Sequence, residues 1–299
     1  MVKRRFHRLS LIHLVTLVPV LSISSLLIWA EQASDKAMRA QNMVVQMRKA
    51  VYGDAKAESI QGISLSWKTR IQRPNGDQDS GETEIDLLLP DKMIKKQMLM
   101  LAGNIGQITT YDLLNGERSW SDTYSSSSET PVMKIGGEDL TKRLQARRKE
   151  QARQFLYLML PPSPDFPLAF TYAGEAEASD GRADVIDVQG PNDFSARLFV
   201  DKITSRLLMM TYKEGILTRL SYKPGSEKID LGEKARAEAV KWIEAKIRFS
   251  DYKPEGSVTL PHLLTYEREG KIVMEQSLKS FRLNPAFPHD HFDPGKKRK

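Results

Sequence analysis

Histidine and acidic residues near the C-terminus are the first candidates for chemistry in this sequence. His289, Asp290 and His291 stand together, and Asp293 follows them. Imidazole and carboxylate groups bind zinc and other transition metals. Two histidines two residues apart in a tail bracketed by prolines are more typical of solvated surface, so we expect no metal site. His262 lies in a predicted strand and has no partner near it in the sequence.

Nucleophilic catalysis has even weaker support. Ser125–Ser128 is a run of four serines, but no G-x-S-x-G turn and no convincing set of histidine and acid accompanies it. Neither a P-loop nor a G-x-G-x-x-G fingerprint occurs. The chain has no cysteine, which excludes disulfides, thiolate catalysis and a lipid-modified N-terminal cysteine. We therefore expect a non-enzymatic protein without a metal or another cofactor.

The positive charge of the chain is concentrated at its two ends. The 299 residues carry a formal net charge of +7 and are 40% hydrophobic, the composition of a globular protein with a sizeable core. Basic residues cluster at Lys3–Arg8 and at Lys296–Lys299, so the sequence between them is nearly neutral. Nucleic-acid binding needs basic residues spread over one face of a fold. We expect no nucleic-acid partner and a monomer.

The N-terminus has the pattern of an exported protein. Residues 1–8 are basic, and Leu9–Ala30 contains no Asp, Glu, Lys or Arg. Residues 1–30 are therefore either a signal peptide, which leaves a soluble periplasmic protein, or an anchor that tethers the protein to the inner membrane. Residues 31–294 are predicted to form a single domain, and residues 295–299 a basic tail.

The first half of the chain reads as a helix followed by a meander. Helical spacing predicts a helix over Ser34–Tyr52, with Ser34 and Asp35 as caps and Gly53 as its stop. Alternation of apolar and polar residues then predicts successive strands separated by turns at Asn75-Gly76 and Asn115-Gly116. The predicted strands are Ile63–Ile71, Glu82–Leu89, Met93–Leu101, Gln107–Asp112 and Glu117–Trp120.

A polar loop over Ser121–Gly137 leads into a second predicted helix, Asp139–Leu160, which ends before Pro161-Pro162. Strands then resume. They are predicted at Leu168–Ala173, at three runs inside Ala183–Tyr212, and at Val258–Glu267 and Lys271–Phe281. Glu214–Lys234 has no clear pattern, and Glu238–Tyr252 is predicted to begin as a helix and to become extended at Ile247.

The tract Ala183–Tyr212 shows the pattern of a sheet most clearly. Tight turns separate its strands, so neighbouring strands must be antiparallel. Phe194, Ala196, Leu198 and Val200 alternate with Ser195 and Arg197. One face of the sheet is therefore apolar and needs a cover or a ligand.

The order helix, long meander, helix and second meander resembles the periplasmic lipoprotein-carrier superfamily of LolA/LolB-like proteins, in its uncharacterised lipoprotein-sorting-like branch. Three phrases carry the resemblance, which covers about residues 34–294. They are GNIGQITTYDLLNGERSW (Gly103–Trp120), the tract Asp184–Leu208 with GPNDFSARLFVDKITSRLL, and Phe249–Phe292 with FSDYKPEGSVTLPH and LNPAF. These are strand and turn signatures, which report fold better than function.

The resemblance implies an α+β fold that is mainly antiparallel β, an unclosed, strongly curved half-barrel sheet with helices covering the concave face. It implies a periplasmic carrier of lipid or of an acylated lipoprotein, with Ser34–Tyr52 and Asp139–Leu160 as a movable lid. The candidate ligand-binding residues are Ile63, Leu65, Trp67, Ile85, Leu87, Phe194, Leu198 and Val200. The same eight residues also fit an ordinary core under a permanently docked helix.

A second hypothesis is an envelope sensor or regulatory protein-binding module of the same fold. It would be held at the inner membrane through Leu9–Ala30.

Overall fold

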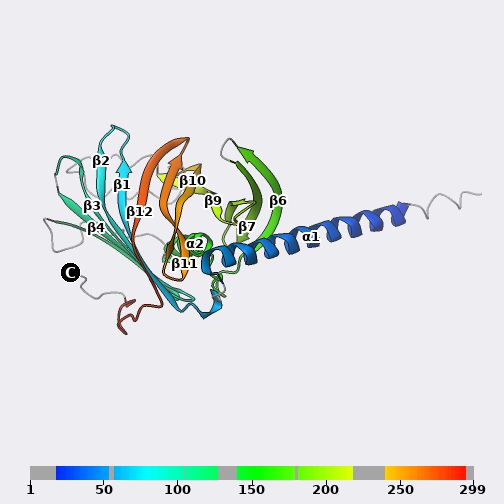
Figure 1. Cartoon of the computed structure of the whole chain (residues 1–299), viewed down its shortest axis with the longest axis horizontal. Coiled ribbons are helices and arrows are strands. Elements are labelled where there is room, and N and C mark those ends of the chain that lie inside the picture. Colours follow the sequence, from blue (N-terminus) through cyan, green and yellow to red (C-terminus); the bar gives the residue numbers. More distant parts are fainter. Residues whose placement is uncertain are drawn as a thin grey trace, which may run out of the picture.

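The computed structural model of this chain describes residues 18–53, 57–104, 106–126, 140–178, 181–217 and 240–293. Its strands form one antiparallel sheet of 12 strands in the order β5-β4-β3-β2-β1-β12-β11-β10-β9-β8-β7-β6. The sheet bends strongly around α2 and the C-terminal half of α1 (Figure 1). It stays open because its two edge strands, β5 and β6, do not pair with each other. The predicted fold class, an unclosed half-barrel with helices on its concave side, is confirmed.

The first half of the chain supplies one helix and the strands β1 to β5. These elements are α1 (Val18–Tyr52), the short 3-10 turn η1 (Ala57–Ser59), β1 (Gly62–Gln72), β2 (Gln78–Leu88), β3 (Lys92–Met100), the 3-10 turn η2 (Ala102–Asn104), β4 (Gln107–Asn115) and β5 (Arg118–Ser125). The second half supplies the other helix and seven strands. These are α2 (Leu140–Tyr157), β6 (Ala169–Ala178), β7 (Gly181–Gly190), β8 (Phe194–Asp201), β9 (Leu207–Leu217), β10 (Val240–Glu255), β11 (Val258–Arg268) and β12 (Lys271–Leu283).

Tight turns build most of the sheet, and one long-range pairing joins its halves. Asn115 pairs with Arg118 across a two-residue turn in which Gly116 has φ 59°, as the sequence predicts. Strand β12 then returns to β1, where Leu65 faces Phe281. Gly81 on β2 allows close pairing with β3, because an added Cβ would lie 1.8 Å from the carbonyl oxygen of Met98.

Helix α1 begins earlier than predicted. It runs without interruption from Val18 to Tyr52, so Ser34 and Asp35 lie inside it and do not cap it. Its end is as predicted, because Gly53 adopts φ 61° and donates its N–H to the carbonyl of Lys49. The N-terminal half projects away from the body (Figure 1). In the described part of the chain, no helix is both long and apolar enough to span a membrane.

Three sequence predictions are corrected by the structure. The predicted helical start of Glu238–Tyr252 is wrong from Val240 onward, because β10 pairs with β9 and β11 along Val240–Glu255. Helix-forming Lys, Glu and Ala residues are overridden by the alternating burial of Ile243, Ala245 and Ile247. The predicted loop over Ser121–Gly137 is wrong at residues 121–125, which belong to β5; residues 127–139 lie outside the described part.

The third correction concerns the end of α2. This helix stops at Tyr157, before the predicted Leu160. Met159 adopts a left-handed φ of 53°, and Leu160 donates its N–H to the carbonyl of Phe155. The chain therefore turns out of the helix before it reaches the two prolines.

Candidate functional site

The concave face of the sheet carries the eight candidate residues, which come from β1, β2 and β8. All eight have side chains at most 4% exposed and belong to the single large hydrophobic core. Their strands are separated by β9 to β12 in the sheet, so its curvature brings them together around the helices. In this closed arrangement the eight residues pack as core beneath α1 and α2.

The same face includes residues that sequence reasoning missed. They lie on β9, β10 and β11, between the strands that carry the predicted residues. The main ones are Met210, Ile247, Phe249 and Leu264. The period-two alternation from Ile243 to Phe249 could have revealed β10, but the helix-forming residues between its apolar positions obscured it.

Helix α1 covers this face with one apolar stripe. Ala40, Val44, Met47 and Val51 recur at helical spacing and are at most 7% exposed. Polar contacts hold the end of the helix to the segment after α2. Arg48 donates its Nε–H to the carbonyl oxygen of Met159 at 3.3 Å.

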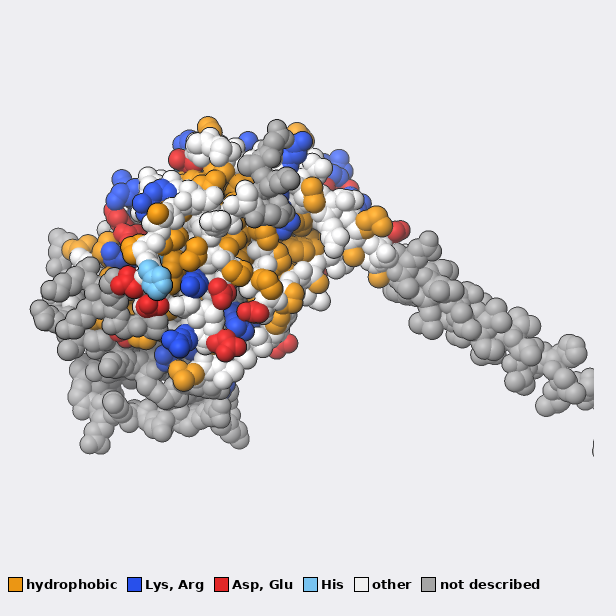
Figure 2. Space-filling model, turned by 90° about the horizontal axis from the view of Figure 1, so that it is seen from below, with side chains coloured by type: hydrophobic (Ala, Val, Ile, Leu, Met, Phe, Trp, Pro, Cys, Tyr) orange, Lys and Arg blue, Asp and Glu red, His pale blue; other side chains and the backbone are white. Residues whose placement is uncertain are grey.

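Nearer the N-terminus of α1, Arg39 contacts β6 and β7, the two strands at one edge of the sheet. Its guanidinium pairs with Asp184 at 3.1 Å and lies 3.5 Å from the ring centroid of Tyr172. Seen from below, hydrophobic side chains gather over the middle of the body next to the root of the projecting helix (Figure 2). Among the described residues, no backbone–backbone hydrogen bond joins α1 to the sheet.

Helix α2 fills the remaining width of the concavity. Ala152, Phe155 and Leu156 are buried against the core. Tyr157 stacks on Phe249 with ring centroids 5.9 Å apart. Between the helices and the sheet, a crevice at Phe170 and Leu198 has a volume of only about 10 Å³. An acyl chain therefore needs the helices to move before it reaches this part of the concave face.

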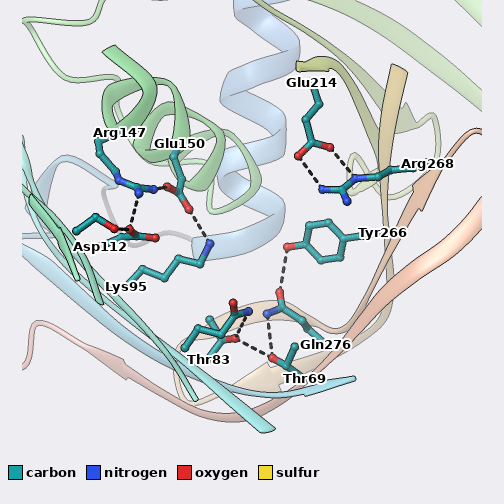
Figure 3. A network of polar contacts seen from close by, with 12 residues as sticks. Thr69, Thr83, Lys95, Asp112, Arg147, Glu150, Glu214, Tyr266, Arg268 and Gln276 are labelled. Atoms are coloured by element: carbon teal, nitrogen blue, oxygen red, sulfur yellow. Dashed lines mark hydrogen bonds and ion pairs between the residues drawn. The ribbon is translucent and has the colours of Figure 1, made fainter. Parts of the chain in front are cut away.

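A group of four charged residues, the α2 cluster, attaches this helix to the sheet (Figure 3). Glu150 on α2 accepts hydrogen bonds from Lys95 on β3 at 2.7 Å and from Arg147 at 2.6 Å. Arg147 also pairs with Asp112 on β4. Burial alone would raise the pKa of Glu150, but the charges of Lys95 and Arg147 hold that pKa far below its usual value.

Glu150 in turn raises the pKa of Lys95. Each of the four groups of the α2 cluster faces an opposite charge. The α2 cluster joins α2 to the part of the sheet formed by β3 and β4.

A chain of neutral hydrogen bonds crosses the floor beside the α2 cluster (Figure 3). Tyr266 donates its hydroxyl to Gln276 at 3.0 Å, and Gln276 donates its amide to Thr69 at 3.1 Å. The hydroxyls of Thr69 and Thr83 are 2.8 Å apart. Burial raises the pKa of Tyr266, with smaller contributions from Tyr212 and Glu150. The concave face thus has two parts. The apolar tier is formed by the core residues, and the polar tier by Tyr266, Gln276, Thr69 and Thr83.

Two of the candidate histidines, His291 and His262, have structural partners. His291 contacts Asp86 at 2.8 Å and stacks on Phe287, which corrects the expectation of a solvated tail. The nearby Phe292 is buried with Ile94 and Leu113 in a small second core. The Nε2 of His262 lies 3.2 Å from the carboxylate of Glu255.

The described residues contain no group of three His, Cys, Asp or Glu side chains placed to hold a metal ion. The serine run Ser125–Ser128 lies only partly within the described residues. Ser125 lies on β5, whereas residues 127 and 128 are outside the described part.

Comparison with known proteins finds solved structures of similar shape. No family model matches the chain, and no curated protein matches it. A LolA superfamily protein from Nitrosomonas europaea is 11% identical, with a TM-score of 0.47 over 85% of this chain and 96% of its own. A domain of an outer membrane lipoprotein-sorting protein from Vibrio parahaemolyticus is 10% identical, with a TM-score of 0.45 over 86% and 97%.

A DUF1329 family protein from Desulfovibrio piger is 12% identical, with a TM-score of 0.47 over 88% of this chain and 99% of its own. These names agree with the LolA-like resemblance of the sequence. At such identities and TM-scores they carry no argument about function. Function must therefore be argued from the sheet and its helices.

Proposed function

We propose that this protein is a non-enzymatic carrier of lipid or of an acylated lipoprotein in the bacterial cell envelope. Its acyl chains would bind the apolar tier of the concave face after α1 and α2 move aside. The observation that carries the proposal is an open sheet whose apolar face is covered by two helices. Hydrogen bonds between strands hold the sheet together without them.

Helix α1 and an acyl chain would stabilise the apolar face of the sheet by comparable free energies. Burying a Val or Met side chain contributes about 1.5–3 kcal/mol, so the stripe of α1 contributes roughly 6 kcal/mol through Val44, Met47 and Val51. An acyl chain contributes about 0.8 kcal/mol for each buried CH₂, so about eight methylenes offset the loss of that stripe. A fatty acyl chain is therefore long enough to replace α1 on the sheet.

Tryptophan fluorescence provides a direct test. Trp67 is 1% exposed on the concave face, whereas Trp242 is 67% exposed and alternates with the buried residues of β10. One variant keeps only Trp67 and carries Phe at the other three positions. The matched control keeps only Trp242, with Phe at Trp29, Trp67 and Trp120. A brominated fatty acid quenches only an indole that it approaches closely.

We expect the brominated fatty acid to quench Trp67 and to leave Trp242 unchanged. Lipid extracted from the purified protein should contain acyl chains. Permanently docked helices would leave Trp67 unquenched and the extract without lipid, and this result would refute the carrier function. Equal quenching of both residues would indicate nonspecific adsorption.

We also propose that the carrier remains tethered to the inner membrane. The continuity of α1 supports this proposal, because the helix passes through Ala30 without a break and continues into the lid. The uncharged segment Leu9–Ala30 would then be an anchor. Residues 9–17 of this segment lie outside the described part. The same continuity favours the sensor as the second candidate, since motion of α1 would connect the membrane with the concave face.

A further inference from the structure

Two buried hydrogen-bond donors under the lid have no acceptor. They are the indole N–H of Trp67 on β1 and the hydroxyl of Tyr157 at the end of α2. Their side chains are 1% and 5% exposed. Neither donor makes a hydrogen bond of ordinary geometry within the part of the chain that the structure describes.

The two neighbouring tyrosines are paired. Tyr52 donates its hydroxyl to the carbonyl of Leu158, and Tyr266 donates to Gln276. Burial is the largest cause that raises the pKa of Tyr157, Tyr266 and Tyr52 raise it further, and an interaction with the indole of Trp67 lowers it, so the two donors lie side by side. If the indole donated to the phenol oxygen, the phenol hydrogen would still need an acceptor. At least one donor therefore stays unsatisfied while the lid is closed.

An unsatisfied buried donor destabilises the closed lid, and an acceptor supplied by a ligand would relieve this cost. The surroundings favour a neutral acceptor, since Tyr157 lies against Phe249 and both donors belong to the apolar core. A charged headgroup would lose its hydration there without an opposing charge. In a ligand whose acyl chains are joined through esters, the ester carbonyl is the neutral acceptor next to the chains.

We propose that Trp67 and Tyr157 bind the ester carbonyl oxygens of the acylated ligand, one from the floor of the sheet and one from the lid. This inference rests on the proposed function. It predicts a preference for acyl esters over ether lipids with the same chains. It also supplies an acceptor where the closed structure leaves a buried donor unsatisfied.

The test compares dioleoylglycerol with its dioleyl ether analogue, which lacks both carbonyls. Wild-type protein should bind the ester about tenfold more tightly, equivalent to ~1.4 kcal/mol. Trp67→Phe and Tyr157→Phe should each reduce that preference about threefold or more and leave ether binding near the wild-type level. Tyr157→Phe should also raise the melting temperature of the empty protein, because it removes an unpaired hydroxyl.

Tyr52→Phe is the matched control, since it removes a buried hydroxyl that has a partner. It should lower the melting temperature and keep the wild-type preference for ester. Equal binding of ester and ether by the wild-type protein would overturn the inference and leave the carrier function standing. Binding of neither lipid would overturn the proposed function itself.

Discussion

Replacing Glu150 with Gln should loosen α2 selectively. The carboxylate receives charged hydrogen bonds from Lys95 and Arg147, and the side chains of Glu150 and Lys95 are 13% and 26% exposed. Removing one partner of a buried ion pair costs about 3–5 kcal/mol. Gln retains one acceptor oxygen, so we expect about 3 kcal/mol. At 1.4 kcal/mol per tenfold change, the undocked population of α2 rises roughly 150-fold.

Hydrogen exchange of the backbone amides measures this population directly. In Glu150→Gln, exchange should accelerate over α2 (Leu140–Tyr157) and stay near wild type in the central strands. Because less of the binding energy is then spent on opening the lid, the brominated fatty acid, used here as the acyl probe, should bind more tightly. The variant thus becomes less stable and a better binder.

Asp187→Asn is the matched control. Asp187 and Arg197 form an ion pair at 2.6 Å on β7 and β8, but their side chains are 40% and 50% exposed. An exposed pair contributes less than about 1 kcal/mol, so α2 exchange and probe affinity should stay near wild type. The reasoning is refuted if α2 exchanges equally in both variants. It is also refuted if probe affinity falls in Glu150→Gln, because the α2 cluster would then not restrain the lid.

Two further predictions concern pH and location. The pKa of Glu150 is lowered in the folded protein, so Glu150 stabilises the docked helix fully above the ordinary carboxylate pKa of about 4.3. This stabilisation is lost as the pH falls toward the pKa of Glu150 in the folded protein. The pKa of Lys95 is raised, so the stabilisation from Lys95 persists until strongly alkaline pH. Emission from the variant that keeps only Trp67 should stay constant at neutral pH and change on acidification, and Glu150→Gln should remove the acid-induced change. Fractionation of cells should recover the protein with inner membranes, with an N-terminus upstream of Glu31; a soluble protein that begins at Glu31 would contradict the tether.

The strands and turns were largely predictable from the sequence because their signals are local. Alternation of Phe194, Ala196, Leu198 and Val200 identified the buried face of β8, and burial of all four confirms it. Asn115-Gly116 identified a tight hairpin through the left-handed conformation that glycine adopts easily. Such patterns depend on neighbours within a few residues, so no tertiary structure is needed to see them.

The course of β10 and the attachment of the lid were decided only by tertiary structure. Lys241–Lys246 contains residues that favour a helix, and pairing with β9 and β11 makes it a strand. The ion pair of Lys95 with Glu150 joins residues 55 positions apart. A charged residue in a sequence does not indicate whether it will meet water or an opposite charge. That outcome depends on how far the sheet curves, because the curvature places the sheet face against α2.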